Sequence, residues 1–288
     1  MGSQRYNCLT MPNPVFNEGT FKEASQNQNG WAAPQAGTHT QTQPVTDGPV
    51  STWRKAMTLN GTISASAVLL LILLAAAAFG WNAAEGPTTV LENGQQVDTY
   101  QFPALGFVGI VIGFIAVIVA MRKPTLARIL GPVYAIGYGF AVGAISKGYE
   151  TFYNGIVLQA VLATASVFGV MLVLYRTRII KVTDKFRRAV IFATLGVMVL
   201  YLGSFIFSLF GGSLPFLNGD NMALSIAFSV FVCGLAAMNL ALDFDFIERA
   251  TNSGMPKEYE WVAALGLVVT LVWLYLEILR LLAKLRSR

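Results

Sequence analysis

Histidine and cysteine are almost absent from this chain. It has one histidine, His39, and two cysteines, Cys8 and Cys233, which lie far apart in the sequence. These counts exclude a disulfide framework, a zinc site of ordinary His/Cys spacing and the histidine-dependent catalytic triads. The motifs GxxxxGK[ST], GxGxxG and HExxH are also missing from the sequence. We therefore expect neither an enzyme nor a bound cofactor.

Charged residues are scarce as well. They make up 12% of the chain, against about a quarter in a typical soluble domain, and hydrophobic residues make up 55%. With a mean hydropathy of +0.57, such a chain cannot cover a globule of its size with polar surface. The composition predicts a polytopic membrane protein whose main partner is the lipid bilayer. The formal net charge of +5 does not indicate nucleic-acid binding, because the lysines and arginines follow a membrane topology.

Long apolar runs dominate the rest of the sequence. Seven of them have the length of a membrane-spanning helix, which needs about 20 residues, and they are too long for strands. We expect helices at residues 57–80, 104–121, 126–146, 152–175, 189–210, 222–242 and 261–282. The predicted fold class is an all-α membrane protein with a bundle of seven transmembrane helices.

The N-terminal segment has a different composition. Residues 1–55 are rich in Gln, Asn, Thr, Pro and Gly and have few large apolar residues, which predicts a disordered polar tail. Residues 56–288 then form the transmembrane domain. The stretch MPNPVFNEGTF offers Met11 as an alternative start to Met1.

The charges between the runs alternate in kind. Basic residues precede the first run and fill the second and fourth connections, and the fourth has six of them between Arg176 and Arg188. The positive-inside rule therefore places the N-terminus in the cytoplasm. The cluster of six could also attract anionic lipids, or it could serve only to fix the topology.

The C-terminal end conflicts with this rule. Seven crossings would place Arg280, Lys284, Arg286 and Arg288 outside. Either the last helix does not cross fully, or a short C-terminal tail escapes the bias. We favour seven crossings.

Glycines recur at four-residue spacing in two of the runs. Gly109 and Gly113 lie in GFVGIVIG, and Gly139 and Gly143 lie in GYGFAVG. Such spacing lets helix backbones approach closely in lipid, although glycine is also common in membrane helices generally. We expect these glycines to support a tightly packed bundle rather than an open pore.

Two aspartates end the sixth run, in NLALDFDFIERA. Residues two apart point to nearly opposite faces of a helix, so Asp243 and Asp245 differ in orientation. Asp245 lies four residues before Arg249, and we expect a solvated interfacial pair. We expect Asp243 to face the bundle, where a carboxylate needs a partner, water or a proton and could sense pH or bind a cation. The alternative is a carboxylate at headgroup level that contributes only to solubility.

Two further charges are candidates for a role in the same protein. Glu277 interrupts the last run in WLYLEILRLL, with Arg280 and Lys284 on the same face. This stripe is typical of a helix surrounded by others, but a local Glu277–Arg280 pair near the membrane boundary is the simpler interpretation. Arg122 ends the second run on the side of Asp243 and could be its counter-ion, or it could be an ordinary positive-inside residue.

The order of these motifs resembles the Bax inhibitor-1 family, the transmembrane BAX inhibitor motif proteins. YAIGYGFAVGAIS is similar to the family's Tyr-Ala…Glu-Gly…Gly pattern, LDFDFIE to its Asp-x-x-x-Ile ending, and ALGLVVTLVWLYLEILRLL to its closing helix. The resemblance covers residues 57–286 and leaves the polar tail outside. NPVFNE before the first helix is similar to the actinobacterial branch of the family. The resemblance implies a bundle with the last helix at its centre, in the cytoplasmic membrane of a bacterium.

The resemblance also implies candidate functions. Some members act as pH-sensitive calcium leaks, in which an aspartate ending the sixth helix pairs with one on the last helix and an arginine on the second helix latches the closed state. Asp243 matches the first aspartate, while the second position falls on Glu277 in one alignment and on Val269 in a nearly gapless one that depth favours. Tyr138 stands where the family has a glutamate.

Two hypotheses follow. The first is a cation leak or membrane homeostasis factor with Asp243 as sensor, with Asp245 and Glu277 as further candidate ion-binding or pH-sensing residues, and with calcium bound only transiently. The second is an interaction protein that binds membrane proteases or other integral partners without transport.

Overall fold

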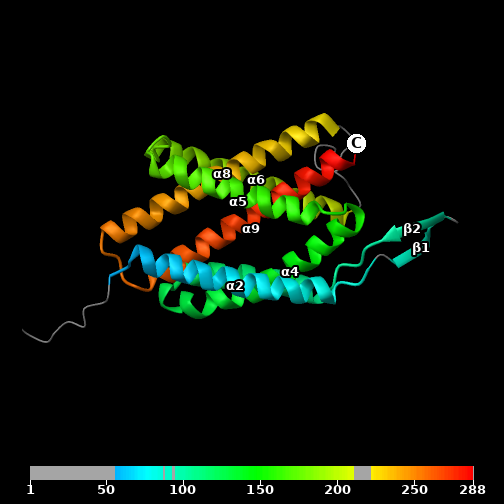
Figure 1. The fold of residues 1–288 in the computed structure, drawn as a ribbon, viewed down its shortest axis with the longest axis horizontal. Coiled ribbons are helices and arrows are strands. Elements are labelled where there is room, and N and C mark those ends of the chain that lie inside the picture. Colours follow the sequence, from blue (N-terminus) through cyan, green and yellow to red (C-terminus); the bar gives the residue numbers. More distant parts are fainter. Residues whose placement is uncertain (1–55, 87, 93–94, 211–221, 288) are drawn as a thin grey trace, which may run out of the picture. The chain divides into compact units, whose positions relative to one another are not determined.

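The computed structural model describes residues 56–86, 88–92, 95–210 and 222–287, and in these ranges seven helices are long and apolar enough to cross a membrane (Figure 1). They are α2 (Leu59–Ala83), α3 (Ala104–Arg122), α4 (Ala127–Phe152), α5 (Ile156–Arg176), α6 (Asp184–Leu209), α8 (Met222–Asn252) and α9 (Tyr259–Arg286). A short 3-10 turn, Pro124–Leu126, leads into α4. The predicted all-α membrane fold with seven spanning helices is confirmed. The predicted tail, residues 1–55, lies outside the described residues.

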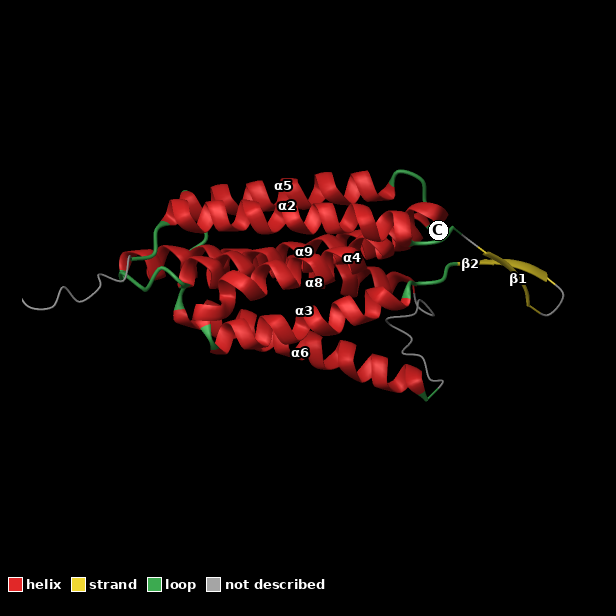
Figure 2. Ribbon diagram, turned by 90° about the horizontal axis from the view of Figure 1, so that it is seen from below, coloured by secondary structure: helices red, strands yellow, loops and turns green. Residues whose placement is uncertain are grey.

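The last helix, α9, is the centre of the bundle. In its most apolar stretch 56% of the residues are buried, against 11% to 50% in the other six helices. It packs against α2, α4, α5 and α8. Figure 2 shows α9 in a middle layer with α4 and α8, between α2 and α5 on one side and α3 and α6 on the other. The central position that the family resemblance implies is confirmed.

The backbones of α2 and α4 approach each other closely, and glycines on α4 make this possible. A Cβ atom at Gly143 would lie 1.9 Å from the backbone oxygen of Ala77, and one at Gly139 would lie 2.6 Å from that of Leu73. Both glycines therefore face the α2 backbone directly. The absence of a side chain is what lets the two helices approach this closely.

A second close crossing joins α3 to α4. A Cβ atom at Gly109 would lie 2.3 Å from the backbone oxygen of Gly137. Gly113, one turn further along α3, differs because its nearest neighbours are the rings of Tyr134 and Tyr138 rather than backbone. Three of the four glycines singled out by spacing thus lie against a neighbouring backbone, and the fourth lies against side chains.

Two helices, α4 and α8, extend furthest beyond the apolar runs that predict them. α8 continues about three turns past the predicted end, and α4 continues to Phe152. In the α8 extension, Ile247 and Ala250 are buried in a cluster with Met57, so the extra turns are amphipathic and packed on the bundle. Asp243 consequently lies inside a long helix rather than at its end.

The connection between α2 and α3 contains a hairpin that the apolar runs do not predict. Strands β1 (Thr88–Glu92) and β2 (Gln95–Thr99) pair antiparallel, and the sequence between them is Asn-Gly, a typical hairpin signal. Just after β2, the Tyr100 hydroxyl donates a hydrogen bond to the Ala144 oxygen of α4 at 2.6 Å. Burial raises the pKa of the Tyr100 phenol. This contact fastens the connection to the bundle.

A buried carboxylate fixes the start of α2 to the start of α9. Glu260 accepts hydrogen bonds from the backbone N–H and the hydroxyl of Thr58, both at 2.9 Å. Gly61 leaves room for it, since a Cβ atom there would lie 2.2 Å from the carboxylate. A carboxylate is stabilised at a helix N-terminus by the unpaired N–H groups and the helix dipole. The N–H of Met57 also donates to the Met255 oxygen at 2.7 Å.

Candidate functional site

Asp243 lies on α8, about 13 Å before the C-terminal end of that helix, and faces α9. Its Oδ1 lies 3.9 Å from the position that a Cβ atom on Gly266 would take, and the Thr270 side chain lies beside the carboxyl. The other oxygen, Oδ2, is buried and has no hydrogen-bond partner among the described residues. Within the described ranges, no lysine or arginine forms an ion pair with Asp243. The sequence therefore places a carboxylate without a fixed counter-ion inside the bundle.

Gly266 keeps space beside this carboxyl. Apart from the nearby α9 backbone and the two residues next to Gly266, Oδ1 of Asp243 is the one atom of the described residues within 4 Å of a Cβ atom built on Gly266. The position thus differs from the glycines of the α2–α4 crossing, where backbone fills the space. A methyl group at position 266 would therefore meet the carboxyl oxygen at ordinary van der Waals distance.

Asp245 points away from α9, toward α6. Its Oδ2 accepts from Arg249 at 2.7 Å, the pair that the sequence spacing predicts, and from Arg187 at 3.1 Å. The side chain is 13% exposed rather than solvated as expected, because Arg187 from the first turn of α6 covers it. With two arginines on one oxygen, Asp245 joins α6 to α8 and has little capacity left for a cation.

Arg122 is not brought to Asp243. It is exposed at the C-terminal end of α3, which packs mainly against α4, and it forms no ion pair with any described residue. Of the two roles considered for Arg122, the structure therefore does not show that of a counter-ion to Asp243.

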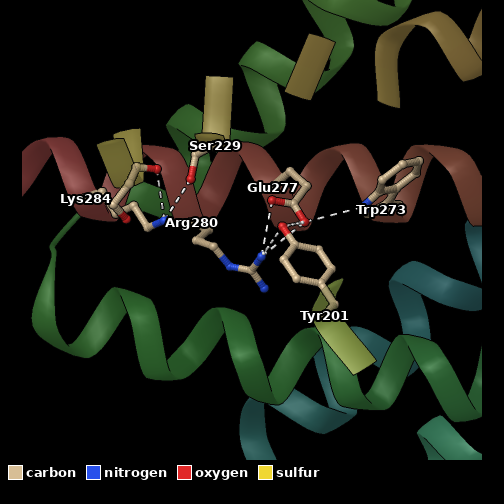
Figure 3. Close-up of polar contacts among 7 residues, drawn as sticks. Tyr201, Ser229, Trp273, Glu277, Arg280 and Lys284 are labelled. Carbon is tan, nitrogen blue, oxygen red and sulfur yellow. Dashed lines mark hydrogen bonds and ion pairs between the residues drawn. The ribbon is translucent and has the colours of Figure 1, made fainter. Parts of the chain in front are cut away.

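Glu277 is the centre of a second polar cluster (Figure 3). Its carboxylate, 3% exposed, accepts from the Tyr201 hydroxyl at 2.9 Å, from the Arg280 guanidinium at 3.2 and 3.3 Å, and from the Trp273 indole at 3.3 Å. Arg280 also donates to the Tyr201 hydroxyl at 2.8 Å and lies 5.0 Å from the centre of its ring. The local Glu277–Arg280 pair predicted from the sequence forms, and its carboxylate is buried in the bundle.

The cations at the C-terminal end of α9 bind oxygen atoms of the protein. Lys284 donates to the Ser229 hydroxyl at 2.9 Å and to the Ser225 carbonyl at 3.3 Å on α8, and Arg286 donates to the Asn154 carbonyl at 2.7 Å. At 28 residues, or about 42 Å, α9 is long enough to cross fully. Of the two explanations for the cations at this end, the length of α9 therefore favours seven crossings.

The carboxylates of Asp243 and Glu277 belong to separate sites. Asp243 lies at the level of Gly266 and Thr270, and Glu277 is roughly two to three turns, or about 10 to 16 Å, further along α9. Val269, the residue at the depth of Asp243, is not ionisable. In the described part of the chain there is also no group of three or more His, Cys, Asp and Glu side chains that could hold a metal.

Sequence reasoning did not identify several residues that make these contacts. Tyr201 and Trp273 in the Glu277 cluster, and Glu260 at the start of α9, were not singled out. Tyr201 carries a signal in retrospect, because it is an aromatic residue with a polar tip in an otherwise apolar run. Glu260 carries none, since its partners lie about 200 positions away.

Comparison with known proteins identifies the family. The sequence pattern of the family described as "Bax inhibitor 1 like" matches residues 13–287. Searches among curated proteins and among solved structures found no match. The family match begins at Asn13, in the NPVFNE stretch, so it includes most of the polar tail that the expected range of 57–286 left outside. The chain belongs to the Bax inhibitor 1 like family of multi-pass membrane proteins.

Proposed function

We propose that this protein is a pH-sensitive cation leak of a bacterial cytoplasmic membrane, with Asp243 as the sensor, calcium as the ion and the N-terminus in the cytoplasm. The observation that carries the proposal is the buried, unpartnered Oδ2 of Asp243. An ionised carboxylate inside a membrane bundle needs a cation, water or a proton to stabilise it. Exchange of a proton for a cation at Asp243 would couple ion passage to pH.

The ligands available beside Asp243 favour a calcium ion that passes through the protein over one that stays tightly bound. Calcium takes six to eight oxygen ligands in tight sites. Beside Gly266 the described side chains offer the Asp243 carboxyl and the Thr270 hydroxyl, so water would supply the remaining ligands. Such a site binds weakly, which suits an ion in transit. Asp245 and Glu277 fit this role less well, because arginines occupy their oxygens.

Asp243→Asn is expected to abolish the pH dependence of calcium flux into proteoliposomes between pH 5 and 8. A single titrating group can change flux by up to about tenfold per pH unit, and asparagine does not titrate in this range. Asp245→Asn is the matched control, because it removes the same charge two residues away and should leave the pH profile in place. Absence of flux above empty liposomes with the wild-type protein would sink the leak proposal.

A second candidate function is a partner-binding protein of the same membrane, without transport, that modulates membrane proteases. It is supported by the family match, which includes most of residues 1–55 although they are too polar for a core. Deletion of residues 1–50 separates the two functions. The leak should keep its wild-type flux and pH profile after the deletion, whereas a tail-mediated interaction should lose co-purifying membrane partners. Loss of flux on deletion would count against a leak that resides in the helices alone.

A further inference from the structure

An uncompensated basic surface lies where α5 ends and α6 begins. Of the six lysines and arginines between Arg176 and Arg188, Arg178 pairs with Glu248 at 2.8 Å and Arg187 pairs with Asp245. The other four are exposed and form no ion pair with any described residue. They are called the basic surface below: Arg176, Lys181, Lys185 and Arg188.

The basic surface lies at the ends of two membrane spans, Ile156–Arg176 and Asp184–Ser208. Between them, Ile179 is 70% exposed although it is flanked by cations. An exposed apolar side chain among lysines and arginines at a span end fits the boundary between headgroups and acyl chains, where long basic side chains reach the phosphates. The connection therefore has the chemistry of a headgroup-binding segment.

The helix that follows is weakly packed. In α6 only 11% of the most apolar stretch is buried, the lowest share among the seven spans. Figure 2 shows the C-terminal end of α6 lying away from the other helices. Polar contacts at three α6 positions one heptad apart hold it on α8 and α9: Arg187 to Asp245, Thr194 to Asn239 and Tyr201 to Glu277. The position of α6 thus depends on few contacts inside the protein.

We propose that the basic surface binds anionic lipid headgroups and thereby holds the start of α6 against α8. Lys185 and Arg188 flank Arg187 on the first turns of α6, so headgroups bound there restrain the turn that carries the Arg187–Asp245 contact. Phosphate oxygens complement four cations that form no ion pair in the part of the chain that the structure describes. The inference is independent of ion conduction. The competing interpretation is that these cations only set the topology.

Lipid binding is tested by titrating phosphatidylglycerol into the purified protein in phosphatidylcholine nanodiscs and counting bound lipids by mass spectrometry. In Lys181→Gln/Lys185→Gln/Arg188→Gln we expect affinity to fall roughly fivefold per cation, or on the order of 100-fold in total. The matched control is Arg122→Gln/Lys123→Gln/Arg128→Gln, which removes three exposed cations from the α3–α4 connection at the same end of the bundle. Equal losses in both triple variants, or a loss in neither, would overturn the proposal.

The effect on α6 needs a separate measurement. Thr194→Cys/Asn239→Cys, made with Cys8 and Cys233 replaced by serine, places two thiols where the side chains now lie 2.9 Å apart. We expect phosphatidylglycerol to raise the yield of this cross-link several-fold, and the Lys181/Lys185/Arg188 triple variant to lose that increase. Lipid binding without any change in cross-linking would overturn the positioning role.

Discussion

Arg280→Ala is expected to destabilise the protein by about 2 to 3 kcal/mol, less than the cost of removing one partner of a fully buried ion pair, because the Arg280 side chain is 39% exposed. The substitution leaves the Glu277 carboxylate, which is 3% exposed, with the Tyr201 hydroxyl and the Trp273 indole as its remaining donors among the described residues. The carboxylate itself is nearly inaccessible to water, so solvation replaces only part of the lost charge compensation. Thermal or denaturant unfolding in detergent micelles measures the effect.

Two variants show whether the loss comes from an uncompensated charge. Glu277→Leu/Arg280→Leu removes both members of the pair and should recover most of the stability, because no lone charge remains. Arg286→Ala removes an exposed arginine on the last turn of α9 and should cost no more than about 1 kcal/mol. If Arg280→Ala were as mild as Arg286→Ala, Glu277 would have to be hydrated or protonated, and the described cluster would not be what stabilises it.

The apolar runs predict the end of a helix well where charged or polar residues directly follow the run and the helix stops there. α3 ends one residue beyond the predicted 121 and α5 one residue beyond the predicted 175, since charged or polar residues follow both. The prediction fails where a helix continues past the end of its apolar run as an amphipathic helix. The last turns of α8 are charged on one side and buried on the other, against Met57, so a hydropathy run cannot detect them.

The same distinction applies to the candidate site: its contacts within one helix can be predicted from the sequence, and its contacts between helices cannot. The 100° periodicity predicts that Asp243 faces the bundle and that Asp245 pairs with Arg249, because both depend on one helix alone. It cannot predict that Arg187 and Tyr201 reach α8 and α9, because these contacts depend on how α6 is placed in three dimensions. Helical periodicity shows on which face of its helix a residue lies, whereas the packing of the helices decides which residue it contacts.

Gly143→Ala is expected to destabilise the protein by about 3 kcal/mol, more than any other single-methyl insertion named here. The new Cβ atom would lie 1.9 Å from the Ala77 oxygen and 2.6 Å from its carbonyl carbon. Both are backbone atoms of α2, so no rotamer change relieves the overlap, and α2 and α4 must separate along their whole crossing. Unfolding in micelles, with retention on size-exclusion chromatography as a check of folding, measures the loss.

Two other glycines turn this prediction into a graded series. Gly113→Ala meets the rings of Tyr134 and Tyr138 at 3.3 and 3.4 Å, and side chains can shift by a few tenths of an ångström, so we expect a smaller loss of about 1 kcal/mol. Gly169→Ala on α5 meets nothing within 4 Å and should be neutral or stabilising by up to about 1 kcal/mol, because alanine favours the helix. If all three substitutions had the same effect, helix propensity rather than backbone contact would govern these positions, and the α2–α4 crossing would not be a tightly packed interface.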